Sequence, residues 1–207
     1  MNTVFRAFVA TAFCRSTIAV FRTFAIALLA VMFGLCQGEA QAQVMTPFRI
    51  SGGGSAPQGL SLIPLTPTLH SAVGQATRLG NYLGHGTLEL TAFTGPTTAQ
   101  FRSGSPFVFV AANGDRLAFT YGDTTNGAAA PGEIALLPQS DGSFVAVLVA
   151  EFNPVPSLST GRFAKVIGGS ITMTWATEPF FIQGTSTTPF AYTWEGQGSL
   201  EFQTSNP

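Results

Sequence analysis

Residues 106–122 read PFVFVAANGDRLAFTYG, and this stretch predicts the fold class. Two runs rich in Phe, Val, Leu and Tyr flank the dipeptide Asn113-Gly114. An Asn-Gly pair between two such runs is the strongest short-range signal of a β-hairpin, because both central residues of a type I′ turn take positive φ. We therefore predict two strands, Pro106–Ala112 and Asp115–Gly122, joined by a type I′ turn.

The same pattern of short apolar runs between turn residues continues on both sides of this hairpin. It predicts six more strands: Gln75–Leu83, Gly86–Phe93, Gly132–Pro138, Ser143–Phe152, Ser170–Thr177 and Phe190–Phe202. Asp141-Gly142 marks a second hairpin turn, and no long segment after residue 42 repeats with the helical period. Eight strands with short links form an antiparallel meander, and eight can close into a barrel without free edges. We predict an all-β, up-and-down, eight-stranded antiparallel barrel, with an open sandwich as the alternative.

The first 42 residues have the pattern of an export signal. Three arginines are the only charges before Glu39, and the stretch Phe24–Cys36 is uncharged. It is too short for a membrane span and is followed by Ala40-Gln41-Ala42, which fits signal peptidase. We predict a signal peptide over 1–42, cleavage before Gln43, and a periplasmic or secreted product with no stable membrane span.

Residues 43–74 show no sustained hydrophobic period. They contain four prolines and the run Gly52-Gly53-Gly54, a composition typical of linkers. We predict an arm or linker over 43–74 and a barrel domain over 75–207.

Composition excludes several classes of function. Charged residues make up 9% of the 207 residues, against about 25% in an average domain. The formal net charge is −1, so no basic excess exists to bind nucleic acid. Both cysteines, Cys14 and Cys36, lie in the predicted signal peptide. The exported chain would therefore have no disulfide, no thiolate metal site and no cysteine nucleophile.

Three glycine-bearing segments carry a family resemblance: Gly74–Gly80 (GQATRLG), Ala111–Leu117 (AANGDRL), and Ser159–Ala164 (STGRFA) followed by Gly168-Gly169-Ser170. In this order they resemble exported bacterial proteins related to the allene oxide cyclase barrel. The resemblance covers about residues 74–203 and implies a barrel similar in architecture to the calycins. It also implies an isomerase or cyclase as one alternative function. No catalytic residue of the plant enzyme matches a motif here.

Catalytic and metal-binding motifs are absent from the sequence. The two histidines, His70 and His85, fall in the predicted arm and in a Gly-His-Gly turn, so we expect exposed loop residues and no metal site. Glu89 and Glu195 lie within predicted strands and would become cavity acids only if the polar faces point inward, with arginines 78, 116 and 162 as counter-charges. We predict neither a metal nor a cofactor.

The last predicted strand offers the remaining candidates for a binding site. Tyr192 and Trp194 share a face with Gly196 and Gly198. Glycine within a strand often marks the close approach of a ligand or another backbone, so we expect this face to look into the barrel and to leave a gap beside Trp194.

Taken together, these residues predict a binding barrel. The candidate ligand-binding residues are Tyr192, Trp194, Gly198, Glu195 and Glu89. The expected ligand is small and apolar, and a homo-oligomer is a further expectation. The alternatives are an isomerase of the allene oxide cyclase type and a structural barrel without a ligand.

Overall fold

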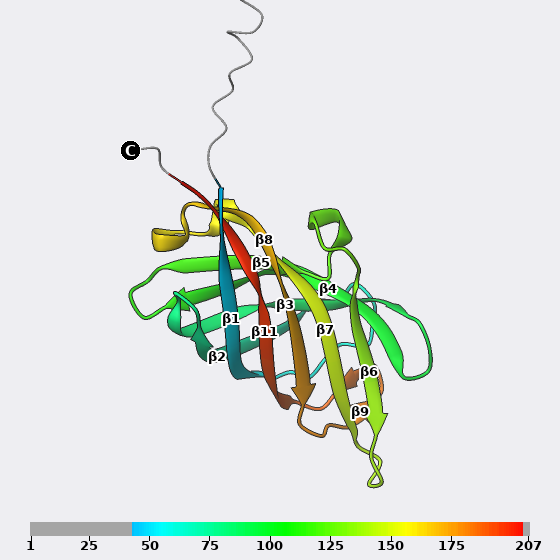
Figure 1. The fold of residues 1–207 in the computed structure, drawn as a ribbon. Helices are drawn as coiled ribbons and strands as arrows, with labels where there is room; N and C mark the ends of the chain where they lie inside the picture. The colour runs from blue at the N-terminus through cyan, green and yellow to red at the C-terminus, as the bar shows by residue number, and fades with distance from the viewer. Residues whose placement is uncertain (1–42, 205–207) are drawn as a thin grey trace, which may run out of the picture. The chain divides into compact units, whose positions relative to one another are not determined.

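The computed structural model describes residues 43–204, which form an all-β fold (Figure 1). Its strands are β1 (Gln43–Ala56), β2 (Thr68–Ala76), β3 (Gly80–Phe93), β4 (Thr98–Ala111), β5 (Arg116–Tyr121), β6 (Gly132–Pro138), β7 (Phe144–Pro154), β8 (Val166–Thr177), β9 (Ile182–Gln183), β10 (Ser186–Thr187) and β11 (Phe190–Gln203). Three 3-10 turns join them: η1 (Thr124–Asn126), η2 (Pro156–Leu158) and η3 (Gly161–Phe163). The predicted signal peptide lies outside the described residues.

The long strands close into an eight-stranded antiparallel barrel, which confirms the predicted fold class. Neighbours around the ring are β1, β2, β3, β4, β5, β7, β8 and β11, and β11 pairs with β1. Strands β5 and β6 together occupy one place in the ring, between β4 and β7. Strand β4 pairs with β5 over residues 107–110 and with β6 over residues 98–101. Both then pair with β7. The count of eight therefore comes from a different set of strands than the sequence predicts.

The predicted arm is wrong, because residues 43–74 supply β1 and nearly all of β2. Strand β1 pairs with β2 on one side and with β11 on the other. The glycines allow close packing rather than flexibility. A Cβ atom at Gly54 would overlap the carbonyl oxygen of Ser71 and the ring of Tyr192, and one at Gly52 would overlap the hydroxyl of Tyr82. Composition alone does not distinguish such a strand from a linker.

The predicted strand Gln75–Leu83 is also wrong, because it contains a hairpin turn. Strand β2 ends at Ala76 and β3 begins at Gly80. Arg78 takes a φ of 63° and Gly80 one of 69°, which reverses the chain between them. The β-branched and apolar residues on both sides of the turn conceal it in the sequence.

The hairpin at Asn113-Gly114 is confirmed, but its turn type differs from the prediction. Gly114 has a φ of 86°, whereas Asn113 is not among the residues with positive φ. The Gly114 amide donates to the Ala111 carbonyl at 2.9 Å, and the Asp115 amide donates to Oδ1 of Asn113 at 3.2 Å. One left-handed residue after a turn closed in this way is the arrangement of a three-residue hairpin loop with a glycine bulge.

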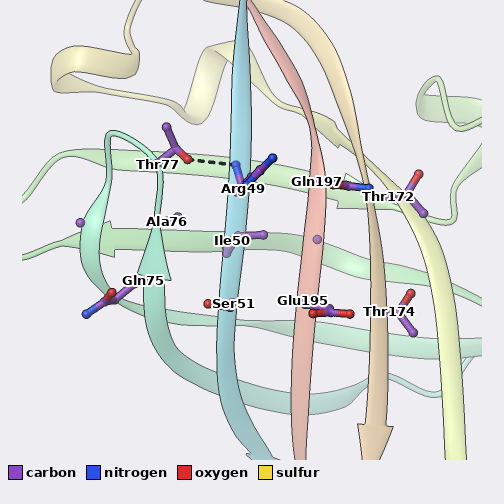
Figure 2. A pocket seen from close by; sticks show the side chains of 12 residues that line it. Arg49, Ile50, Ser51, Gln75, Ala76, Thr77, Thr172, Thr174, Glu195 and Gln197 are labelled. Atoms are coloured by element: carbon purple, nitrogen blue, oxygen red, sulfur yellow. Dashed lines mark hydrogen bonds between the residues drawn. The ribbon is translucent and has the colours of Figure 1, made fainter.

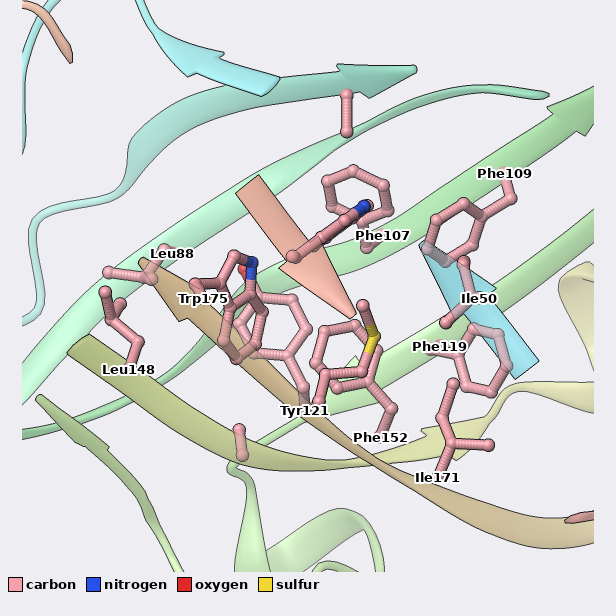
Figure 3. Close-up of a cluster of buried hydrophobic side chains, with 14 of the residues drawn as sticks. Ile50, Leu88, Phe107, Phe109, Phe119, Tyr121, Leu148, Phe152, Ile171 and Trp175 are labelled. Atoms are coloured by element: carbon pink, nitrogen blue, oxygen red, sulfur yellow. The ribbon is translucent and has the colours of Figure 1, made fainter. Parts of the chain in front are cut away.

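Aromatic rings fill the barrel interior. Figure 3 shows this cluster, in which Phe107, Phe109, Phe119 and Phe152 are completely buried. The Tyr121 ring stacks on Phe152 with centroids 4.6 Å apart. Stacked and edge-to-face contacts between rings bury large apolar areas. This burial, rather than a disulfide, stabilises the barrel interior.

Each end of the barrel is closed by a phenylalanine from outside the long strands. At the aromatic end, which we define by the N-terminus of β1 and the C-terminus of β11, Phe163 of η3 is fully buried. At the opposite end, which we call the pocket end, Phe180 is buried together with Leu60. The amides of Leu62 and Thr187 tie the connection 57–67 to the β9–β10 hairpin, donating to the carbonyls of Thr185 and Leu60.

Candidate functional site

The pocket end contains a small apolar cavity, which we call the end pocket. Its volume is about 40 Å³. The lining is mostly aliphatic and aromatic: Ala56, Leu60, Leu88, Ile134, Ala146, Leu148, Trp175, Phe180 and Phe190. Four polar residues complete it: Thr68, His70, Thr177 and Tyr192. Ligand sites usually combine an apolar lining with few, well-placed polar groups, so this cavity has the composition of a site at a small volume.

His70 is the central polar group of the end pocket. It lies near the start of β2 and is 5% exposed, and the centroid of its ring is 4.9 Å from that of Phe107. Both ring nitrogens have a tyrosine partner. Nδ1 lies 2.9 Å from the Tyr192 hydroxyl, and Nε2 lies 2.8 Å from the Tyr121 hydroxyl.

The two tyrosine hydroxyls also reach backbone carbonyls. That of Tyr192 lies 3.0 Å from the Ser71 carbonyl oxygen, and that of Tyr121 lies 2.9 Å from the Thr87 carbonyl oxygen. These contacts form one series of hydrogen-bonded groups, whose members belong to β2, β11, β5 and β3. We call it the Tyr-His-Tyr chain.

Burial controls the protonation of this chain. Desolvation lowers the pKa of His70 to about 3, so the imidazole is neutral near pH 7. Desolvation also raises the pKa of Tyr121 and of Tyr192 above the usual value, so both hydroxyls keep their protons. A neutral imidazole of such low basicity is a poor general base near pH 7.

Tyr192 and Trp194, two of the predicted site residues, do point into the barrel. Tyr192 lines the end pocket. Trp194 is buried deeper, where its Nε1 donates to the Tyr82 hydroxyl at 2.8 Å and Tyr82 donates to the Ser51 carbonyl at 3.1 Å. Burial raises the pKa of Tyr82 to about 12, so this hydroxyl is also neutral. The prediction that this face of β11 points into the barrel is therefore correct for Tyr192 and Trp194.

The predicted gap beside Trp194 is absent, so Gly198 is not a ligand-binding residue of this cavity. A Cβ at Gly196 would lie 2.6 Å from Cγ of Met173, and one at Gly198 would lie 2.7 Å from Cα of Ile171. Both glycines pair with these residues of β8. The glycines let β11 and β8 approach each other, and neighbouring side chains occupy the space.

Glu195 points away from the barrel interior and lines a groove on its outer surface. Figure 2 shows this outer groove over β1, β2, β8 and β11, with Arg49, Gln75 and Gln197 around Glu195. Its volume is about 750 Å³, and these side chains are exposed. Exposed polar groups are already hydrated, so a ligand gains little by replacing their water. The structure does not bring Glu195 to the other candidates.

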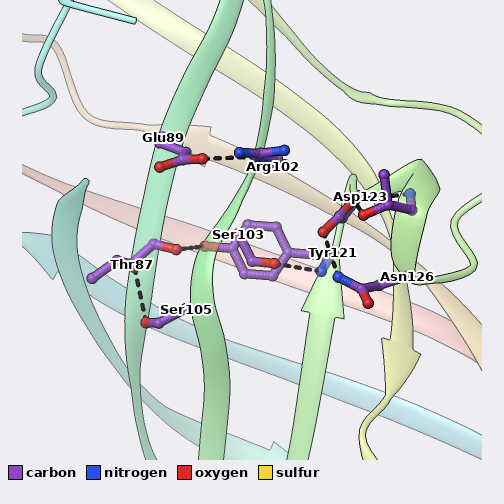
Figure 4. Close-up of polar contacts among 9 residues, drawn as sticks. Thr87, Glu89, Arg102, Ser103, Ser105, Tyr121, Asp123 and Asn126 are labelled. Carbon is purple, nitrogen blue, oxygen red and sulfur yellow. Dashed lines mark hydrogen bonds and ion pairs between the residues drawn. The ribbon is translucent and has the colours of Figure 1, made fainter. Parts of the chain in front are cut away.

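Glu89 lies in the barrel wall and forms an ion pair. Its Oε1 accepts from Nε of Arg102 at 2.7 Å, beside the Ser103 and Asp123 side chains (Figure 4). The predicted counter-charges are wrong, because Arg102 is the partner of Glu89. Arg162 instead pairs with Asp115 at 2.6 Å. Glu89 is 7% exposed but faces an outer groove of about 560 Å³, not the end pocket.

The prediction of two exposed loop histidines is wrong in part. His85 is exposed but lies within β3, and His70 is buried within β2. In the part of the chain that the structure describes, no three His, Cys, Asp or Glu residues come together as metal ligands. His70 and Tyr121 are thus the site residues that sequence analysis missed. Strand alternation over Thr68, His70 and Ala72 was the available signal.

In comparisons with family models, with curated proteins and with solved structures, nothing matches this chain. The resemblance to allene oxide cyclase barrels stays a prediction. Between residues 43 and 204, no helix has the length and apolar character that crossing a membrane requires.

Proposed function

We propose that this protein is a binding barrel that takes a small apolar ligand at its pocket end. The observation that carries the proposal is the end pocket, where an apolar lining surrounds one buried Tyr-His pair. Ligand sites commonly combine an apolar lining with a small number of polar groups that fix the orientation of the ligand.

The ligand enters by displacing the cover of the pocket. A cavity of about 40 Å³ holds only a few atoms, whereas drug-sized ligands occupy about 300 to 1,000 Å³. Leu60 and Phe180 form this cover and come from connections outside the long strands. Loops open at lower free energy than barrel strands, so ligand uptake leaves the barrel intact.

Toluene tests this proposal through the methyl groups of Leu60, Ile134 and Leu148. We expect toluene to shift their NMR signals in the wild-type protein. Ala146→Leu fills the pocket and should abolish the shifts. Ala135→Leu is the matched control, because Ala135 lies on the neighbouring strand and does not line the cavity.

A structural barrel without a ligand is the second candidate, and the dense aromatic packing of the remaining interior favours it. If toluene leaves the pocket methyl signals of the wild-type protein unchanged, the binding proposal fails and the structural function stands. Cyclase or isomerase activity gains no support from His70, given its low pKa of about 3.

Export of the protein is part of the same proposal, and it rests on the basic, apolar and Ala-Gln-Ala segments of residues 1–42. The intact mass of the exported product should correspond to a chain that begins at Gln43. A secreted product that retains residues 24–36 would contradict the predicted cleavage.

A further inference from the structure

Exposed apolar side chains gather at the pocket end, on the segments that surround the cover of the end pocket. These segments are the connection 57–67, the C-terminus of β3, and the connection 178–189, which contains β9 and β10. Hydrogen bonds join them, because the Leu62 amide donates to the Thr185 carbonyl and the Leu65 amide donates to the Leu90 carbonyl. Five large apolar residues here are between 38% and 60% exposed, and we call them the apolar rim: Ile63, Leu65, Phe93, Phe181 and Ile182.

The apolar rim belongs to the same segments as the pocket cover. Phe180 is buried over the end pocket, whereas its neighbour Phe181 is exposed. Successive side chains of an extended segment point to opposite sides, so one short segment closes the pocket and presents an aromatic ring outward. Figure 1 shows β9, which follows Phe181 directly, near the C-terminal end of β8. A surface that holds Phe181 therefore acts on the segment that must move when the pocket opens.

The two ends of the barrel differ in charge. The pocket end has four connections, which span 57–67, 94–97, 139–143 and 178–189. They contain no Lys or Arg, and their charged residues are Asp141 and Glu178. The connections at the aromatic end contain four charged residues: Arg78, Asp115, Arg162 and Lys165. The aromatic end thus suits water, and the apolar, nearly uncharged pocket end suits a surface that excludes water.

We infer that the pocket end docks on a neutral lipid surface, into which the apolar rim inserts. Apolar side chains that enter the boundary between headgroups and acyl chains leave water, which drives such binding. The pocket end has no basic residue to attract anionic headgroups, so the surface that fits it is zwitterionic. That this lipid supplies the apolar ligand rests on the proposed function of the end pocket, whereas the docking itself does not.

The size of the apolar rim favours lipid over a protein partner. A large apolar residue has about 200 Å² of surface, so the five partly exposed residues offer roughly 500 Å². Each partner of a stable protein interface buries about 800 Å² in one complementary patch. The rim residues stand on three separate segments instead of one sheet face. A fluid lipid surface accommodates such side chains one by one and needs no complementary shape.

Co-sedimentation with phosphatidylcholine vesicles tests the docking. The protein recovered from the export compartment is used, after its mass has shown whether residues 1–42 are absent. The wild-type protein should sediment with the vesicles, and added phosphatidylserine should not strengthen its binding. Phe181→Ser should weaken the partition constant by about fivefold, because a half-exposed phenylalanine no longer leaves water. Leu83→Ser is the matched control, since Leu83 is 66% exposed but lies on β3 near the aromatic end, and it should bind as the wild type does.

A fluorescence measurement tests the same contact without removing an apolar side chain. The two tryptophans of the chain, Trp175 and Trp194, are buried in the core. Phe181→Trp adds an exposed indole at the apolar rim, and its emission should shift to shorter wavelength when phosphatidylcholine vesicles are added. Leu83→Trp places the indole on the barrel wall, and its emission should stay unchanged.

The outcomes separate lipid docking from the proposed function. Docking is overturned if the wild-type protein does not sediment with vesicles, or if Phe181→Ser and Leu83→Ser weaken binding equally. Self-association without vesicles that Phe181→Ser abolishes, measured by analytical ultracentrifugation, would show that a second copy covers the rim and would also overturn it. Toluene-induced shifts without vesicle binding would overturn docking alone. Vesicle binding without toluene-induced shifts would overturn the ligand pocket and leave docking in place.

Discussion

The two ends of the barrel interior are closed in the same way but packed differently. At the aromatic end, Phe163 is fully buried, and Phe48, Phe109 and Phe119 of the same hydrophobic core are fully or almost fully buried too. At the pocket end, Phe180 has a comparable position, but small residues such as Ala56 and Ala146 line the space beneath it. Side-chain size, rather than barrel geometry, thus determines where a cavity remains.

Truncation of the two closing phenylalanines gives the strongest test of this comparison. Phe163→Ala and Phe180→Ala should each lower the free energy of unfolding by about 3–5 kcal/mol, because both rings are fully buried. Only Phe180→Ala should strengthen the toluene-induced shifts, since it enlarges the end pocket. Denaturant unfolding and NMR titration measure the two effects. Equal gains in toluene binding would show that the two ends do not differ as described.

The polar content of the pocket end should make its stability depend on pH. The folded pKa of His70 is about 3, against 6.5 unfolded, so the unfolded chain binds more protons between these values. Stability is therefore full above pH 6.5 and falls as pH decreases. The groups that contact His70 are Tyr121 and Tyr192, which stay neutral in this range, and Glu89 acts only on Tyr121.

This dependence is measurable by denaturant unfolding at pH 7 and pH 5. The wild-type free energy of unfolding should fall by about 2 kcal/mol, since each pH unit below 6.5 costs about 1.4 kcal/mol. His70→Leu should remove most of this slope, and His85→Gln, at an exposed position, should not. A slope that survives in His70→Leu would place its origin elsewhere.

Gly53 and Gly54 are neighbours in β1, so side chains added at the two positions would point to opposite faces of the strand. Substituting each of them compares the packing on these two faces. Gly54→Ala should cost about 1–3 kcal/mol, because its Cβ would overlap the Ser71 carbonyl and the Tyr192 ring. Gly53→Ala should cost less, since its nearest contact is the Tyr192 carbonyl oxygen at 3.3 Å. Unfolding midpoints measure both. Equal costs would argue that strand entropy, rather than close packing, explains these glycines.

The smallest predicted effect concerns the hairpin far from the pocket. Gly114 has a φ of 86° and no atom near its missing Cβ, so substitution strains only the backbone. Gly114→Val should cost about 1 kcal/mol or slightly more, and Gly114→Ala somewhat less, because β-branched residues resist positive φ most. Thermal unfolding measures both. No change in midpoint for either variant would contradict the left-handed turn.

Strand β2 shows why the candidate site was hard to predict. Its apolar residues Leu69 and Val73 are 48% and 56% exposed, whereas Thr68 and His70 face the core. A rule that turns apolar residues inward places His70 on the outside. A shift of one residue exchanges the two faces of a strand, so hydrophobicity alone assigns the wrong face of β2 to the core.

The sequence by itself determined the all-β class and the hairpin at Asn113-Gly114, because turn chemistry and strand alternation are local properties. It also indicated correctly that Tyr192 and Trp194 face inward. Only the tertiary structure made β1 and β2 part of the barrel and brought His70 to its two tyrosines. These partners lie 51 and 122 residues away along the chain. Such contacts depend on the order and register in which the strands close the barrel, which no local pattern encodes.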